Sequence, residues 1–210
     1  VTRVSDASDF YHVGDMVFSY VVEIRTQDLS YPNIAKLGLR ALATNQLSGS
    51  MPNITCLVKG KKVLAPQVQY LGVDVSSDDY YWDPATSKWR KWDNTELSWD
   101  GATYIEQYSA NPVWCLKDLL TNDRYGLGQY INTSFISNAD WLVLARYCDE
   151  KVSDGDGGYE KRFRMDVVID SSSRAVDILN QLVAIFRGIL FFSENSFKLV
   201  IDRLDTPVQL

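Results

Sequence analysis

The side chains that most often carry enzyme chemistry are sparse in this chain of 210 residues. The single histidine, His12, stands beside Tyr11, and a histidine base needs an oriented partner before it can activate a nucleophile. No nucleophile-elbow pattern accompanies it. A surface or structural role is therefore predicted for His12, and we expect no catalytic residues and no enzyme.

Paired carboxylates are the next candidates, as at Asp78 and Asp79 or Asp154 and Asp156. Their neighbours are mainly Gly, Ser and Tyr, and no apolar context there predicts a raised pKa. The Asp-Gly-Asp-Gly stretch from Asp154 lacks the glycine and glutamate spacing of a calcium loop, so it is predicted to form a turn. The glycines after Tyr125 are too few for a phosphate loop. We expect neither a metal nor a cofactor.

Four tryptophans crowd into one polar segment, at Trp82, Trp89, Trp92 and Trp99. Exposed aromatic clusters can stack on sugars or anchor a protein partner. A loop folded onto its own aromatic cluster is the favoured interpretation, because aromatic rings bury so much area. A carbohydrate-binding module that uses the segment from Trp82 to Trp99 remains the alternative function.

The composition is that of a globular, acidic chain. Apolar residues make up 46% of it, the formal net charge is -6 and the pI is about 4.8. A general nucleic-acid-binding surface usually needs a basic footprint. The basic runs are short and are predicted to be solvated: Lys59, Lys61, Lys62 and Lys88, Arg90, Lys91.

Three cysteines, Cys56, Cys115 and Cys148, are too few and too widely spaced for a disulfide framework. A reduced, cytosolic origin fits them best. No signal peptide is visible, and no apolar run approaches the ~18 residues that span a bilayer, so no membrane insertion is expected. The missing initiator methionine suggests a piece of a longer polypeptide.

The first half is predicted to be rich in strands. β-Branched and aromatic residues run from Met16 to Ile24, as is typical of a strand. Residues 54–58 and 62–64 flank residues 59–61 in the manner of a hairpin. Residues 72–101 have little aliphatic content and are predicted to form a long structured loop or short strands.

The second half predicts three helices. Asn111 before Pro112 is typical of a helix start, which gives a helix over residues 112–121. A capping-box spacing at Ser137 begins a second helix over residues 138–150. A third helix is predicted over residues 173–187. Its apolar stripe consists of Val176, Leu179, Leu182, Val183 and Phe186.

Strands are predicted around these helices. Phe163, Met165, Val167 and Ile169 alternate as in a strand with one buried face, and residues 189–201 have the pattern of a strand, a turn and a strand. The fold class is therefore α+β, with a β-rich region over residues 1–105 and an α+β region over residues 106–210. The two regions could also form one domain.

Several stretches together resemble the tail-tip host-specificity proteins of lambda-like long-tailed phages. They are Tyr31-Pro32, Trp82-Asp83-Pro84-Ala85-Thr86, Trp99-Asp100-Gly101, Asn111-Pro112-Val113-Trp114, Asp118-Leu119-Leu120-Thr121-Asn122-Asp123-Arg124-Tyr125-Gly126-Leu127-Gly128, Ala145-Arg146-Tyr147-Cys148-Asp149-Glu150, Gly157-Gly158-Tyr159-Glu160-Lys161-Arg162-Phe163 and Phe186-Arg187-Gly188. The similarity runs from about Tyr31 to Phe192.

The resemblance implies an internal fragment of a structural virion protein of a phage or prophage. That protein is a trimeric central hub that closes the tail tube, takes part in host attachment and DNA ejection, and contacts other tail-tip proteins. The tape-measure protein and DNA pass through without specific binding, and assembly takes place in the cytoplasm of the bacterial host. No catalytic residues come with the family.

The structural or interface candidates come from this string and from the tryptophan segment. They are Trp114, Arg124, Tyr125, Gly126, Gly128, Trp82, Trp89, Trp92 and Trp99. Trp114 is expected to anchor a helix, and Gly126 and Gly128 to adopt backbone conformations that other residues avoid. The Arg124 guanidinium is expected to bond backbone carbonyls or an acidic neighbour and to hold the turn.

Overall fold

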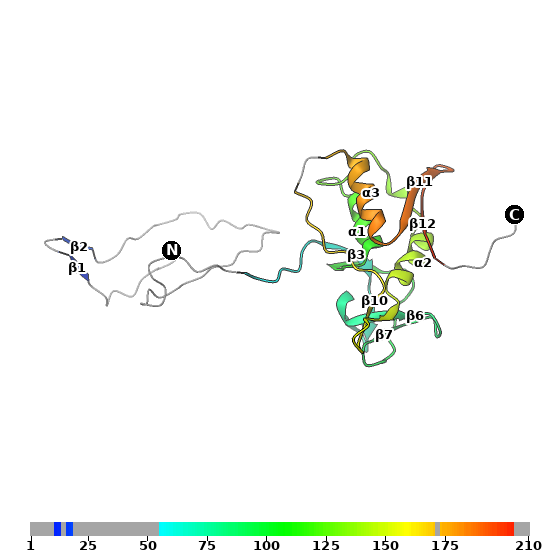
Figure 1. Ribbon diagram of the computed structural model, residues 1–210, viewed down its shortest axis with the longest axis horizontal. Helices are drawn as coiled ribbons and strands as arrows, with labels where there is room; N and C mark the ends of the chain where they lie inside the picture. Colours follow the sequence, from blue (N-terminus) through cyan, green and yellow to red (C-terminus); the bar gives the residue numbers. More distant parts are fainter. Residues whose placement is uncertain (1–10, 14–15, 19–54, 171–172, 204–210) are drawn as a thin grey trace. The chain divides into compact units, whose positions relative to one another are not determined.

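The computed structural model describes residues 11–13, 16–18, 55–170 and 173–203 (Figure 1). The chain divides into two compact units, Val1–Thr55 and Cys56–Leu210. In the first unit, β1 (Tyr11–Val13) pairs antiparallel with β2 (Met16–Phe18). The predicted strand from Met16 is confirmed for residues 16–18, and its remainder lies outside the described residues.

The three predicted helices are confirmed as α1 (Pro112–Thr121), α2 (Asn138–Cys148) and α3 (Ala175–Ile185). Asn111 caps α1, because its side-chain oxygen accepts a hydrogen bond from the Val113 amide at 3.0 Å. Ser137 caps α2 in the same way through the Asp140 amide. No described helix is long and apolar enough to span a membrane.

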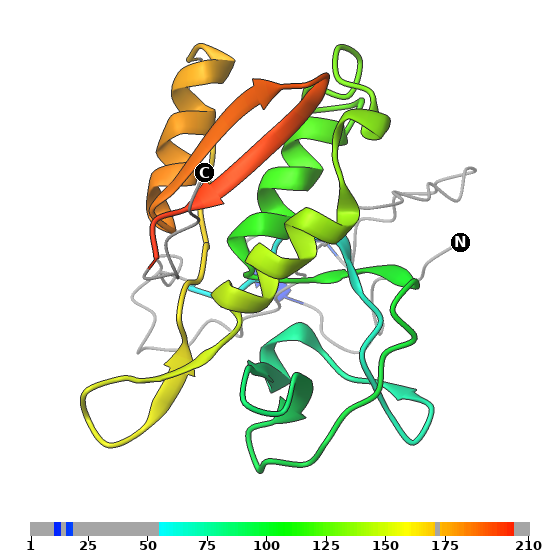
Figure 2. The same cartoon turned by 90° about the vertical axis from the view of Figure 1, so that its right-hand side faces the viewer.

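The predicted hairpin over residues 189–201 is also confirmed. β11 (Gly188–Ser193) pairs antiparallel with β12 (Ser196–Ile201), and β11 contacts α3 while β12 contacts α2. Figures 1 and 2 both show this hairpin and the helices grouped at one end of the second unit, and β6 and β7 at the other.

The predicted hairpin around residues 59–61 is wrong. β3 (Lys62–Pro66) pairs antiparallel with β8 (Tyr104–Tyr108), and residues 55–61 form no strand. Val63 and Ala65 of β3 are buried against α1. β3 therefore pairs with the distant strand β8 and not with the residues just before it. The predicted boundary near residue 105 falls inside β8 and remains a prediction.

The main core lies between α1, α2, α3, β3 and the β11–β12 hairpin. Its most buried members are Val113, Trp114, Leu116, Leu120, Trp141, Ala145, Cys148 and Phe186. The short η2 (Thr133–Phe135) connects α1 and α2. Cys148 is buried, as expected of a small apolar side chain. In the predicted stripe of α3, Leu182 and Val183 are buried, whereas Val176, in the first turn, is exposed.

Residues 72–101 form short strands, which was one of the two predicted outcomes. The strands between β3 and β8 are β4 (Gln69–Tyr70), β5 (Val73–Asp74), β6 (Tyr80–Asp83) and β7 (Lys88–Lys91), with η1 (Ser77–Asp79) before β6. β6 and β7 pair antiparallel and place Trp82 opposite Trp89. A second, smaller core forms from Val68, Tyr80, Trp82, Trp89 and Leu97.

The predicted strand over residues 163–169 is wrong. The strands nearby are β9 (Lys151–Ser153) and β10 (Tyr159–Lys161), which pair antiparallel around the glycine-rich turn. Residues 162–170, which follow β10, belong to no strand, and Met165 alone of the four alternating residues is buried. Alternation favours a strand, but only a neighbouring strand can supply its hydrogen bonds.

Candidate interaction surface

The tryptophan segment is folded onto itself, as the favoured interpretation expects. The rings of Trp82 and Trp89 meet edge to face, with centroids 5.0 Å apart and planes at 70°. Tyr80 meets Trp89 in the same way at 5.1 Å, and Trp89 keeps only 3% of its surface exposed. These two indoles are therefore core residues and not a flat sugar platform.

Trp92 and Trp99 lie at the edge of this cluster. The Trp92 indole N–H donates to the Asp78 carbonyl at 2.9 Å, and the Trp99 indole N–H donates to the Thr103 carbonyl at 2.7 Å. Trp92 remains 37% exposed. Both rings are thus held by backbone acceptors, and Trp92 alone of the four presents a large face to solvent.

Helix α2 is connected to this cluster by Arg146. The guanidinium carbon lies 4.1 Å from the Trp82 ring centroid and 5.9 Å from that of Trp99. Desolvation by burial lowers the pKa of Arg146. A cation over an indole face is an attractive arrangement, so this side chain couples the smaller core to the helices.

A buried ion pair lies between the two cores. Lys161 Nζ is 2.7 Å from Asp149 Oδ1 and donates to the Ser77 carbonyl at 2.6 Å. The Tyr80 ring lies beneath the same ammonium, 4.8 Å away. Burial raises the pKa of the Asp149 carboxyl, and the neighbouring Lys161 charge opposes that shift. The sequence pairs Asp149 with Glu150 and does not reveal Lys161 as its partner.

The string after α1 folds as a tight turn. Trp114 is 2% exposed, and its ring packs edge to face on Tyr104. The Leu127 amide donates back to the Leu119 carbonyl at 2.9 Å. Trp114 is thus buried in the first turn of α1, and its role as the helix anchor stays a prediction.

Gly126 and Gly128 are required in this turn for a different reason from the predicted one. Neither has a positive φ. A Cβ on Gly126 would collide with the Leu119 carbonyl oxygen, and one on Gly128 with the Thr121 carbonyl oxygen. The close approach of backbone to backbone, and not an unusual dihedral angle, excludes a side chain here.

Arg124 does not hold this turn. It is exposed, and its side chain makes no hydrogen bond or ion pair within the described part of the chain. Asn122 holds the turn through three hydrogen bonds. Its side-chain oxygen accepts from the Arg124 amide at 3.0 Å, and its carbonyl accepts from the amides of Gly126 and Gly128, each at 3.1 Å. A short amide side chain reaches the adjacent backbone more readily than a long guanidinium.

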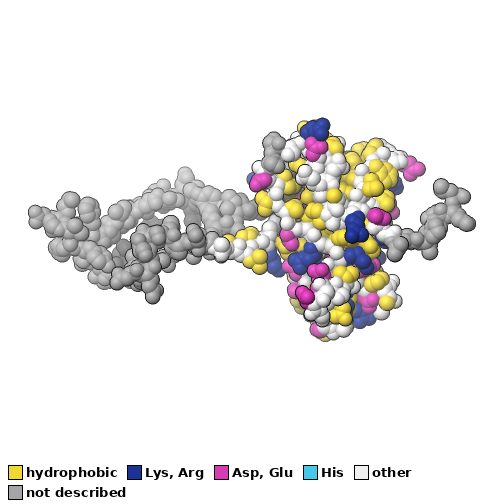
Figure 3. Space-filling model, viewed as in Figure 1, with side chains coloured by type: hydrophobic (Ala, Val, Ile, Leu, Met, Phe, Trp, Pro, Cys, Tyr) yellow, Lys and Arg dark blue, Asp and Glu magenta, His cyan; other side chains and the backbone are white. Residues whose placement is uncertain are grey.

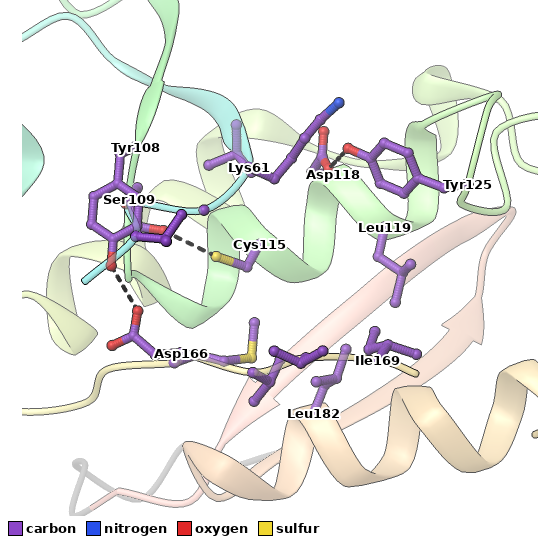
Figure 4. Close-up of a pocket in the computed structure, with 16 residues that line it drawn as sticks. Lys61, Tyr108, Ser109, Cys115, Asp118, Leu119, Tyr125, Asp166, Ile169 and Leu182 are labelled. Carbon is purple, nitrogen blue, oxygen red and sulfur yellow. Dashed lines mark hydrogen bonds between the residues drawn. The ribbon is translucent and has the colours of Figure 1, made fainter. Parts of the chain in front are cut away.

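Tyr125 belongs to a groove (Figure 4). Its hydroxyl donates to the Asp118 carboxylate, and the Lys61 ammonium lies 4.7 Å from its ring centroid. The groove has a volume of about 470 Å³ and an apolar floor between α1 and α3. Its apolar lining includes Val58, Val63, Leu119, Met165, Val167, Val168, Ile169 and Leu182.

The exposed apolar side chains are not confined to the groove. Ile189, Phe191 and Val200 share the outer face of the β11–β12 hairpin and are 64%, 44% and 49% exposed. Figure 3 shows apolar side chains interspersed with charged ones across the visible face of this unit. The three side chains on the hairpin are neighbours on one face, and grouped apolar side chains of this kind can mark a contact with another protein, whereas scattered ones are ordinary.

The described residues offer little for catalysis. No group of acidic, cysteine or histidine side chains among them could hold a metal ion. The Cys115 thiol, which lines the groove, donates to the Ser109 carbonyl, and burial raises its pKa to about 12. The thiolate form needed for nucleophilic attack is therefore disfavoured.

The Asp154 carboxylate accepts from the Asp156 and Gly158 amides, which confirms the predicted turn.

Comparison with known proteins identifies relatives over most of the chain. No family model matches. A tip attachment protein J of Escherichia phage SECphi27 is 42% identical over 110 residues, which are 52% of this chain and 9% of that protein. A tip attachment protein J of Escherichia phage SECphi4 is 30% identical over 199 residues, which are 95% of this chain and 16% of that protein.

The resemblance seen in the sequence is thereby confirmed. The chain belongs with the tail-tip host-specificity proteins of lambda-like phages and corresponds to a segment of one. The chain spans less than a fifth of the length of these curated relatives.

Proposed function

We propose that the chain is a structural part of a phage or prophage tail tip and acts in attachment to the host. The observation that supports this most strongly is the 30% identity to a tip attachment protein over 95% of the chain. Similarity over nearly the whole chain includes both cores and the surfaces between them, so it is not the likeness of one local motif.

The described surface is suited to assembly. A groove between α1 and α3 and the outer face of the β11–β12 hairpin both present apolar side chains to solvent. Tail-tip neighbours would bury such surface and gain roughly 25 cal/mol for each Å² removed from water. A structural role needs these faces and needs no catalytic group.

The finer proposal is that the parent protein is the central hub of the tip. Three copies would close the end of the tail tube, contact neighbouring tail-tip proteins, and let the tape-measure protein and DNA pass at ejection. The acidic net charge of -6 supports passage without capture, because a basic lining would bind phosphates tightly through counterion release.

Immunogold electron microscopy of intact phage tests the location. An antibody raised against the purified chain should label one end of the tail, distal to the head, and an antibody against the tail-tube protein should label its length. Labelling along the whole tube by the antibody against the chain would contradict the proposal. So would a complete absence of label on intact particles whose denatured proteins react with the same antibody on a blot.

A further inference from the structure

Residues 166–170 have the composition of a strand, but no described residue pairs with their backbone. Three β-branched residues, Val167, Val168 and Ile169, stand between Asp166 and Asp170, and β-branched residues favour extended structure. The Met165 amide donates to the Ala110 carbonyl at 2.8 Å. Beyond it, no backbone hydrogen bond is made by residues 166–170 to any described residue.

The apolar side chains of this segment are poorly covered. Val168 is 87% exposed, and Val167 and Ile169 are 49% and 48% exposed. The segment runs along the groove between α1 and α3 (Figure 4), whose floor includes Leu119 and Leu182. Strand addition needs free backbone hydrogen-bonding groups and pockets for alternate side chains, and this segment and the adjoining groove offer both.

A second unpaired segment borders the same groove. Residues 55–61 form no strand, and their Val58 and Lys61 line the same groove as Val167 and Ile169. Leu57 is fully exposed and Val58 is 67% exposed. The groove is thus bordered by two lengths of chain whose backbone groups make no hydrogen bond to the described residues and whose apolar side chains are only partly covered.

The charges at the two ends of the segment bear on the occupant. Asp170 is exposed. Asp166 is 57% exposed at its side chain, although the Tyr108 hydroxyl donates to it at 2.7 Å and the Arg164 guanidinium lies 3.8 Å away, so one side of this carboxylate is already occupied. A second copy of the segment, paired antiparallel about Val168, would set Asp166 against Asp170 at both ends, and like charges directly opposite are destabilising. A strand with an apolar centre and a basic residue at each end would instead meet opposite charges.

We propose that this groove, between α1, α3 and residues 166–170, receives an extended segment of a different chain, apolar at its centre and basic at both ends. The added strand pairs with the backbone of residues 166–170 and places alternate side chains in the groove. The inference rests on the proposed function, since a tail tip supplies neighbouring chains, but its test does not depend on phage assembly.

A synthetic peptide with alternating valine and threonine and a lysine at each end tests the occupant. The purified chain should bind it saturably by fluorescence anisotropy, and hydrogen exchange should slow at residues 166–170. The matched peptide with an aspartate at each end should bind roughly two- to fivefold more weakly for each charge replaced. Equal binding of both peptides would overturn the proposal.

Variants of the segment distinguish strand pairing from nonspecific hydrophobic binding of the peptide. Neighbouring residues of a strand direct their N–H groups to opposite sides, so Val167→Pro and Val168→Pro should differ, one abolishing binding and the other leaving most of it. Where either variant fails to fold by circular dichroism, Asp170→Lys replaces it, with weaker binding of the lysine-ended peptide expected.

Several results would contradict pairing of the added strand with residues 166–170. Equal effects of the two folded proline variants would overturn the proposal, as would unchanged binding by Asp170→Lys. Slow hydrogen exchange at residues 166–170 in the chain alone would overturn it too, because the segment would then already have a partner. A tail tip that labels correctly while the peptides fail to bind would leave the proposed function intact and remove this inference alone.

Discussion

At the scale of single residues, the pair between Lys161 and Asp149 is the most consequential polar contact described. Both side chains lie between the two cores, at 7% and 1% exposure. A carboxylate taken out of water is tolerated only where a partner compensates it. The pair therefore ties the strand β10 to the end of α2.

Lys161→Met should destabilise the chain by about 3–5 kcal/mol, because it leaves the buried Asp149 carboxylate without its partner. Urea denaturation followed by tryptophan fluorescence measures this. Lys88→Met is the matched control, since Lys88 pairs with Glu96 at 2.9 Å but both side chains are about half exposed, and it should change stability by at most about 1 kcal/mol. Equal losses in the two variants would contradict the role assigned to burial.

Asn122 and Arg124 reverse the roles expected from the sequence. Asn122→Ala should cost about 0.5–2 kcal/mol, by analogy with the loss of a capping side chain. Arg124→Ala should stay within about 0.5 kcal/mol of the parent, because its side chain is exposed and contacts no hydrogen-bond or ionic partner among the described residues. Thermal melts of the two variants beside the parent are sufficient. A larger loss for Arg124→Ala would restore the guanidinium as the residue that holds the turn.

At the scale of elements, the turn after α1 depends on backbone packing. Gly128→Ala should lower the stability by about 1–3 kcal/mol, because the added methyl group meets the Thr121 carbonyl and the structure must shift. Gly60→Ala is the control: its Cβ would meet nothing within 4 Å. If Gly128→Ala melted at the same temperature as the Gly60 variant, the close approach would not be a constraint.

The tryptophan segment separates the structural hypothesis from the carbohydrate-binding one. Trp89→Ala should cost about 3–5 kcal/mol as a core truncation, and Trp92→Ala should cost clearly less because Trp92 is 37% exposed. On a glycan array neither the parent nor Trp92→Ala should bind saturably. Saturable glycan binding that Trp92→Ala abolishes would favour the carbohydrate-binding module.

At the scale of the whole molecule, charge governs what the surface retains. Three copies would bring 3 × (-6) = -18 formal charges to a hub. Asp79, Asp154 and Asp156 are exposed, whereas Asp78 lies within 3.5 Å of the Lys59 ammonium and 3.8 Å of the Arg164 guanidinium. Our hypothesis is that exposed acidic side chains on such a hub keep DNA from adhering to it. Of these four carboxylates, the exposed three are the candidates, and solubility alone also explains them.

The purified chain should not shift duplex DNA in a gel at low salt, where electrostatic binding is strongest because the Debye length is longest. The triple variant with lysine at positions 79, 154 and 156 adds six units of positive charge and is the positive control. Salt-sensitive binding by the parent itself would refute the non-adhesive hypothesis and restore a nucleic-acid function.

Local pattern was enough for the elements whose stability is local. The helices after Asn111 and Ser137 begin where their capping side chains predict, since a cap and an apolar stripe act within a few residues. The β11–β12 hairpin is predictable for the same reason, because its two strands are neighbours along the chain. The resemblance to tail-tip proteins was also present in the order of short motifs.

Pairing across long distances was decided by the tertiary structure alone. β3 joins β8 and not the residues before it, Lys161 meets Asp149 and Ser77, and residues 163–169 alternate as a strand without becoming one. Composition and periodicity state which backbone and side chains need a partner. Which partner they receive depends on the whole fold, because hydrogen bonds and buried charges are satisfied only by groups brought within a few ångströms.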